Sequence, residues 1–169
     1  ILVESGVDVT IKGDGHKIDA TLTGDIEAGD EGAHNPGMDA VSIVEGGSLT
    51  LENVTLNISK TGAGENATQG IYNDGTLNLG QGATVTIDGV SQNGINGEGI
   101  GALNIENAEL TVQNVSGTAV KAGATSISNS TVSVTGTGAH GISVTDLTVT
   151  GGAAVTVDGA AYYGVRPSG

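Results

Sequence analysis

The 169-residue chain has no cysteine, no tryptophan and no phenylalanine, and it has only three tyrosines. The absence of cysteine excludes a disulfide framework and thiolate metal ligands, although it leaves an extracellular location open. Five basic residues stand against 19 acidic ones, and the net charge of -14 opposes binding to nucleic acid or to anionic membranes. No run of about 18 apolar residues occurs, so we expect no segment that inserts into a membrane as a helix.

What the sequence does contain is a repeat of roughly 20 to 30 residues, in which each copy begins with a small residue followed by an aliphatic one. The copies of this first element are Ala40-Val41, Gly70-Ile71, Gly99-Ile100, Ala119-Val120, Gly141-Ile142 and Gly164-Val165. Gly94-Ile95 is an alternative to Gly99-Ile100, and the sequence leaves this choice open. A period of this length is typical of solenoids and other repeat architectures.

Two further elements follow the first in each copy. The second is Leu49/Leu51, Leu77/Leu79, Leu103/Ile105, Thr125/Ile127 and Leu147/Val149, and the third is Leu56/Ile58, Val85/Ile87, Leu110/Val112, Val132/Val134 and Val155/Val157. Their aliphatic residues alternate with polar ones, which is the pattern of a strand with one buried face. We therefore expect an all-β fold: a single-stranded parallel β-helix, or β-solenoid, with three short strands per coil and about six or seven coils.

Other features of the repeat refine this prediction. We expect residues 1–169 to form one β-solenoid domain, because repeats run through the whole chain. Asn53, Asn107 and Asn129 follow the second element at the same distance, where a ladder of side-chain amides is expected along the axis. The aromatic pair Tyr162-Tyr163 is expected to close a coil. Both chain ends are strand-like, so we expect a fragment of a longer exported protein.

The longest interruption of the repeat is an acidic insertion loop, predicted over residues 23–39. Its carboxylates are Asp25, Glu27, Asp30, Glu31 and Asp39. Carboxylate oxygens are the ligands that calcium prefers, so these five residues are the candidate metal site and calcium is the one cofactor that the sequence suggests. The loop lacks the spacing of an EF-hand, and a solvated acidic loop is the simpler interpretation.

No arrangement of residues points to catalysis. His16, His34 and His140 lie in different copies and lack the spacing of zinc ligands. Outward positions along the first element are expected to be Ser42, Tyr72, Lys121 and Ser143. They offer none of the paired carboxylates that glycoside hydrolysis needs. We therefore expect no enzymatic activity, and we rank a polysaccharide lyase or glycoside hydrolase below the non-enzymatic hypotheses.

The segment from Gly70 to Leu79, followed by residues 82–87, resembles bacterial parallel β-helix surface proteins, in particular autotransporter passengers and related adhesins. The segment from Gly6 to Gly15 is similar to the opening coils of pectate-lyase-like helices. The resemblance covers nearly the whole chain and implies a right-handed helix that is exported to the bacterial cell surface or secreted.

Two functional hypotheses follow. The first is an adhesin or self-association rod, whose loops and sides contact host glycans, host proteins or identical subunits. The second is a structural subunit of an extracellular filament, assembled head to tail by end-to-end stacking or strand exchange. We expect binding to involve the irregular copies between Thr23 and Glu98, where the excursions at 60–69 and 92–98 are predicted to lie beside one another.

Overall fold

The computed structural model describes residues 1–23, 38–61 and 68–167, and all of its regular secondary structure in these ranges is β. The strands are β1 (Leu2–Val3), β2 (Asp8–Lys12), β3 (Lys17–Leu22), β4 (Asp39–Ile43), β5 (Ser48–Glu52), β6 (Thr55–Lys60), β7 (Gln69–Asn73), β8 (Thr76–Leu79), β9 (Thr84–Asp88), β10 (Ile95–Asn96), β11 (Ala102–Glu106), β12 (Glu109–Val115), β13 (Val120–Ser128), β14 (Thr131–Thr137), β15 (Ile142–Thr150), β16 (Ala154–Ala160) and β17 (Val165–Pro167).

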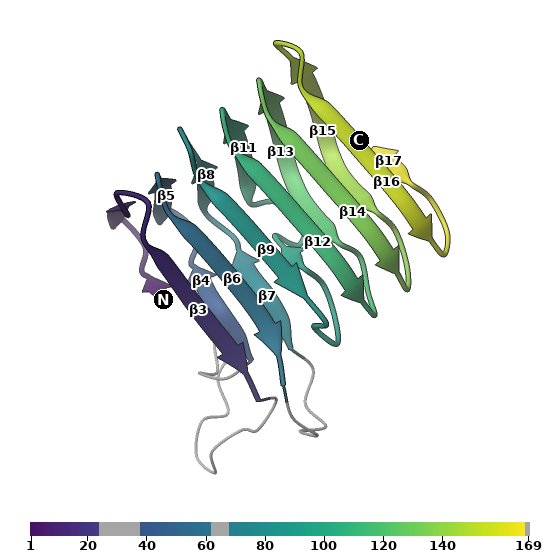
Figure 1. Cartoon of the computed structure of the whole chain (residues 1–169), viewed down its shortest axis with the longest axis horizontal. Helices are drawn as coiled ribbons and strands as arrows, with labels where there is room; N and C mark the ends of the chain where they lie inside the picture. Colours follow the sequence, from purple (N-terminus) through teal and green to yellow (C-terminus); the bar gives the residue numbers. More distant parts are fainter. Residues whose placement is uncertain (24–37, 62–67, 168–169) are drawn as a thin grey trace.

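These strands form a parallel β-solenoid, as the sequence predicts. Every strand pairs in parallel with its counterpart in the next coil, and the pairs assemble into an 11-stranded sheet, here called sheet A, and a 6-stranded sheet, called sheet B. Sheet B takes one strand from each of six successive coils, in the order β3, β6, β9, β12, β14 and β16. Figure 1 shows this sheet crossing the molecule from the N-terminal to the C-terminal coil.

Sheet A contains the first and second elements of the repeat. In the first four coils these elements are separate strands, such as β4 and β5. In the last two coils they merge into the nine-residue strands β13 and β15. One end of β13 pairs with β10 and the other with β11, so a single strand belongs to both ladders. The expected three strands per coil therefore become two in this part of the solenoid.

The core consists of aliphatic ladders whose members lie directly above one another. One ladder in sheet A is Val9, Leu49, Leu77, Leu103, Thr125 and Leu147, and one in sheet B is Ile18, Leu56, Val85, Leu110, Val132 and Val155. Members in the middle coils are fully buried, as at Leu49 and Leu77, whereas those in the outer coils, such as Val9 and Val155, are only partly buried. The predicted alignment of the second and third elements is confirmed.

The alignment of the first element needs one correction. Ile95 pairs with Ile71 on one side and with Val120 on the other, and it is completely buried. Ile100 is 63% exposed and lies in a turn between β10 and β11. The alternative Gly94-Ile95 is therefore the correct copy. A β-carbon at Gly94 would lie 2.4 Å from Val112 Cγ1 of sheet B, which explains why a small residue precedes the aliphatic one.

The prediction of an amide ladder at Asn53, Asn107 and Asn129 is also wrong. Asn53, Asn107 and Asn129 have φ values of 47°, 53° and 49°. Asparagine tolerates this left-handed conformation better than most residues, and here it makes the turn from sheet A to sheet B. Among the described residues, the side-chain amides of these three asparagines make no hydrogen bond to one another. Their role is conformational, and an amide ladder forms elsewhere, on the outer face of sheet A.

Candidate functional site

The first candidate is a hollow at the corner where the chain passes from sheet B to the first ladder of sheet A. We call it the corner hollow. It has a volume of about 470 Å³ and is lined by Gln69, Ser91, Gln92, Asn93, Asn96, Glu98, Ser116, Gly117 and Lys121. Every lining side chain is polar, so the hollow offers hydrogen-bond donors and acceptors and almost no apolar surface.

Hydrogen bonds between successive coils fix the shape of this corner. The Thr68 backbone N–H donates to Ser91 Oγ at 2.9 Å, and the Ser91 N–H donates to Thr68 Oγ1 at 3.1 Å. One coil further, the Thr118 N–H donates to Asn93 Oδ1 at 2.8 Å. Thr68 ends the excursion predicted at 60–69, and Gln92 begins the one at 92–98. The prediction that these two excursions lie side by side is confirmed for their described residues.

Two acidic side chains lie next to the corner hollow: Asp39 at the start of β4, and Asp74 directly after β7. Tyr72 stands in register with Asn96 of the hollow, and its hydroxyl donates to Asp74 Oδ2 at 2.5 Å. This hydrogen bond, together with burial and the charges of Asp74, Glu98 and Asp39, raises the pKa of Tyr72 well above its usual range. The Tyr72 hydroxyl therefore stays protonated and acts as a donor to Asp74.

Asp39 is the one predicted calcium ligand in the described part of the chain. It begins β4, opposite Gln69 of β7, and burial raises the pKa of its carboxyl to about 6. Asp39 Oδ1 and Gln69 Oε1 are both buried acceptors without a hydrogen-bond donor in the described residues. The other four residues of the predicted site, Asp25, Glu27, Asp30 and Glu31, lie outside the described ranges. Within those ranges no three His, Asp or Glu side chains gather to hold a metal ion.

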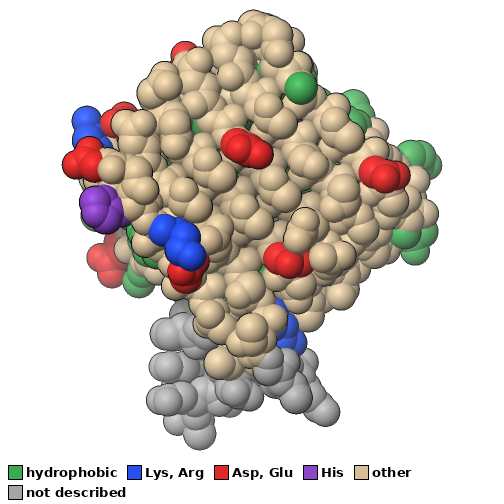
Figure 2. Space-filling model, in the orientation of Figure 1, with side chains coloured by type: hydrophobic (Ala, Val, Ile, Leu, Met, Phe, Trp, Pro, Cys, Tyr) green, Lys and Arg blue, Asp and Glu red, His purple; other side chains and the backbone are tan. Residues whose placement is uncertain are grey.

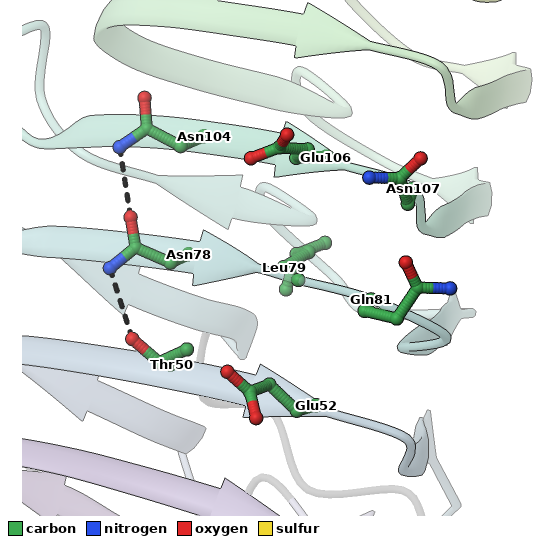
Figure 3. Close-up of a pocket in the computed structure, with 9 residues that line it drawn as sticks. Thr50, Glu52, Asn78, Leu79, Gln81, Asn104, Glu106 and Asn107 are labelled. Atoms are coloured by element: carbon green, nitrogen blue, oxygen red, sulfur yellow. Dashed lines mark hydrogen bonds between the residues drawn. The ribbon is translucent and has the colours of Figure 1, made fainter.

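A second candidate lies on the outer face of sheet A, where polar side chains replace the aliphatic ones of the core. Asn104 Nδ2 donates to Asn78 Oδ1 at 2.9 Å, and Asn78 Nδ2 donates to Thr50 Oγ1 at 3.2 Å. Figure 3 shows these three side chains in one column across β5, β8 and β11. This column, the amide ladder, forms one side of a hollow of about 460 Å³.

Two carboxylates line the amide-ladder hollow, and the sequence reasoning did not identify them as a pair. Glu52 on β5 and Glu106 on β11 are separated by the coil that carries Gly80, so their backbones lie about 10 Å apart at the usual strand spacing. Glu52 forms a salt bridge with Lys12 at 3.2 Å. Both glutamates occupy the position after the last aliphatic residue of the second element, a signal that aligning the outward positions would have shown.

The outer face of sheet B is different from both hollows. Threonine, serine and asparagine stand in register there, as at Asn57, Thr86 and Thr111. Figure 2 shows this face as broad uncharged polar surface interrupted by isolated carboxylates. The two hollows described above lie at the corner and on sheet A.

Comparison with known proteins returns no match to any family description, to any curated protein or to any solved structure. The conclusion that the structure supports directly is the architecture, a parallel β-solenoid. Within the described ranges there is also no helix with the length and apolar character that a bilayer crossing requires.

Proposed function

We propose that this protein is a non-enzymatic recognition rod of the bacterial cell surface or extracellular space, and that it binds glycans through the corner hollow. The observation that carries the proposal is the hollow itself: a polar cavity fixed by hydrogen bonds between coils and positioned where the repeat is irregular. Loops held by a rigid scaffold are the usual place for recognition. The adhesin assignment and the extracellular location rest on the resemblance of the repeats to bacterial surface proteins.

The chemistry of the lining favours a saccharide over an apolar ligand. Gln69, Gln92 and Asn93 offer amide groups that both donate and accept hydrogen bonds, and Ser91 and Ser116 add hydroxyl groups. A sugar presents the same mixture of donors and acceptors around each ring. Because the lining of this hollow is polar, a host protein that docks through a hydrophobic anchor fits it less well than a glycan.

A glycan-binding experiment with matched variants tests this proposal. Gln92 and Glu98 are exposed, and neither side chain makes a hydrogen bond to a residue that the structure describes. We expect Gln92→Ala and Glu98→Gln to weaken binding of an uncharged glycan several-fold, while Thr135→Ala on the outer face of sheet B leaves it unchanged. The proposal fails when a broad glycan array shows no binding to the folded protein, or when all three variants bind equally.

The proposal includes no turnover of the ligand. Lys12 holds Glu52 in a salt bridge on one side of the amide-ladder hollow, which supports a structural role for this glutamate. A product assay on neutral and acidic polysaccharides, with Glu52→Gln and Glu106→Gln as variants, checks this point. Cleavage that both substitutions abolish would favour a polysaccharide-degrading enzyme.

A specific observation favours the filament as a second candidate function. The aliphatic ladders are less well covered at both ends of the stack: Val9, Ile11 and Ile18 in the first coil are only partly buried, and Val149 (45%) and Val165 (43%) in the last coil are exposed. A second copy placed head to tail would continue these ladders and pair the open strand edges. This association would bury apolar surface that is now in contact with solvent.

Sedimentation and electron microscopy distinguish the two functions. Head-to-tail assembly predicts fibres whose formation depends on protein concentration and is abolished by Val149→Lys, a charge at the proposed contact. Monomeric rods at high concentration would exclude the filament and leave the glycan-binding proposal in place. Side-by-side association would instead give clusters without fibres.

A further inference from the structure

We propose that the corner hollow continues into a strip of unpaired cations and aromatic rings that binds carboxylate-bearing saccharides. This inference deepens the proposed function and rests on it, because it names the class of glycan. The strip comprises Lys121, His140, Ser143, Tyr163 and Arg166, with Tyr162 at its edge. These residues form two rows that run along the solenoid, each row taking residues from successive coils.

The first row follows the outward positions of the first ladder of sheet A. Asn96 pairs with Lys121, Lys121 with Ser143, and Ser143 with Arg166. Lys121 lines the corner hollow, so the row leads from the hollow towards the last coil. Two strand spacings of about 4.8 Å separate Lys121 from Arg166, which places the two cations about 10 Å apart with a hydroxyl between them.

The cations of this row have no carboxylate partner within residues 1–23, 38–61 and 68–167, although acidic residues outnumber basic ones in the chain by 19 to five. Lys12 forms a salt bridge with Glu52, and Lys17 forms one with Asp19. Lys60 is also not without an interaction partner. Among the described residues, neither Lys121 nor Arg166 forms a salt bridge, even though Glu98 lines the same hollow as Lys121. Both unpaired cations therefore face one strip, where an external anion would find them available.

The second row supplies flat aromatic surface beside these cations. The His140 ring stacks on Tyr163 with centroids 5.5 Å apart and an interplanar angle of 15°, and the Tyr162 ring lies 5.7 Å from His140. Tyr162 is 73% exposed and Tyr163 is 61% exposed. Aromatic faces that stay in water next to a polar site provide a surface on which the C–H groups of a sugar ring can pack.

His140 makes only one long contact with the Arg166 guanidinium. Arg166 Nη1 lies 3.4 Å from His140 Nε2, and the Tyr163 N–H lies 3.4 Å from His140 Nδ1. A neutral imidazole has one acceptor nitrogen, so it can accept from only one of these two donors at a time. With respect to the described part of the chain, most of the five guanidinium N–H groups are therefore available to a carboxylate, which this planar group can bind with two parallel hydrogen bonds.

The test compares acidic saccharides with their uncharged derivatives. The probes are a galacturonic acid hexamer and 3′-sialyllactose, each measured beside the same compound with its carboxylates converted to methyl esters, by titration calorimetry at low salt. We expect the acidic form to bind about tenfold more tightly than the ester, and Arg166→Gln to remove this difference. Lys121→Gln should reduce it in part, and Arg166→Lys should restore part of it, because the charge returns without the planar fork.

Lys17→Gln is the matched control, since it removes the same charge at an exposed residue of sheet B whose partner is Asp19. Equal binding of acid and ester, or equal losses in Lys17→Gln and Arg166→Gln, would overturn the inference while leaving glycan binding by the hollow intact. Acid-selective binding that Gln92→Ala leaves unchanged would support the strip and refute the hollow. No binding of any saccharide refutes both, with circular dichroism confirming that each variant is folded.

Discussion

The raised pKa of Asp39 predicts that lowering the pH stabilises this protein through one carboxyl group. Burial shifts the pKa of Asp39 from 3.8 to about 6, because the negative charge is partly removed from water at the start of β4. In the unfolded chain the group titrates near its ordinary value. Between these two pKa values the native state holds one more proton than the unfolded state, so stability rises as the pH falls from about 7 to about 4.

The magnitude follows from the size of the shift. A shift of about two units corresponds to about 3 kcal/mol, and we reduce this to about 1–2 kcal/mol because the side chain is partly exposed and solvent screens its charge. Asp39→Asn removes the charge without changing the shape of the side chain. We therefore expect the variant to be more stable than the wild type by about 1–2 kcal/mol at pH 8 and by much less at pH 4.5.

Urea unfolding at both pH values measures this difference. Acidification also stabilises a chain of net charge -14 by reducing the repulsion among its other carboxylates. This contribution is nearly the same in the variant and the wild type, so it cancels when the two are compared at the same pH. Asp19 is the control of opposite sign, because its pKa is lowered by hydrogen bonds from Lys17 and Asn57, so its contribution is present at neutral pH and is lost in acid. A difference between Asp39→Asn and the wild type that does not change with pH would refute the reasoning.

Three other predictions concern the ladders, the turns and the insertion loop. Leu77→Ala, at the centre of a fully buried ladder, should lower the free energy of unfolding by about 2–5 kcal/mol in urea titrations, whereas the same change at the partly buried Leu147 should cost less. Gly101→Ala should lower the melting temperature strongly, because its β-carbon would lie 1.7 Å from the Asn73 carbonyl oxygen, while Gly80→Ala, with 3.4 Å to its nearest atom, should be neutral or slightly stabilising. If the acidic loop binds calcium, thermal unfolding should shift upward in excess calcium relative to excess chelator, and equal curves would discard the site.

The solenoid can be predicted from the sequence because the pattern that specifies each strand lies within a few consecutive residues. Alternating aliphatic residues at Leu77 and Leu79 or at Val85 and Ile87 can be buried only on one side of a strand, and the spacing of the copies gives the register of each ladder. The choice between Ile95 and Ile100 could not be made in the same way, since both follow a glycine. It depends on contacts between coils, here the close approach of Gly94 to Val112.

The candidate sites were predictable to a smaller extent. The outward row through Tyr72, Lys121 and Ser143 follows directly from the repeat alignment, and placing Ile95 correctly adds Asn96 to it. The corner hollow depends on hydrogen bonds between side chains of different coils, which no local pattern encodes. That Arg166 forms no salt bridge with a carboxylate of the described residues likewise depends on distances between coils, which the sequence alone does not give.

The turn at 97–101 shows that a corner of the solenoid can change in length while the strands on either side keep their register. Residues are added between β10 and β11, yet Ile95 and Leu103 stay in register with their neighbours on both sides. The length of a corner can therefore vary without a shift in the register of the ladders. For engineering, the corner between β10 and β11 is a natural position for a randomised loop, and a library built there would sample new binding surfaces on an unchanged core.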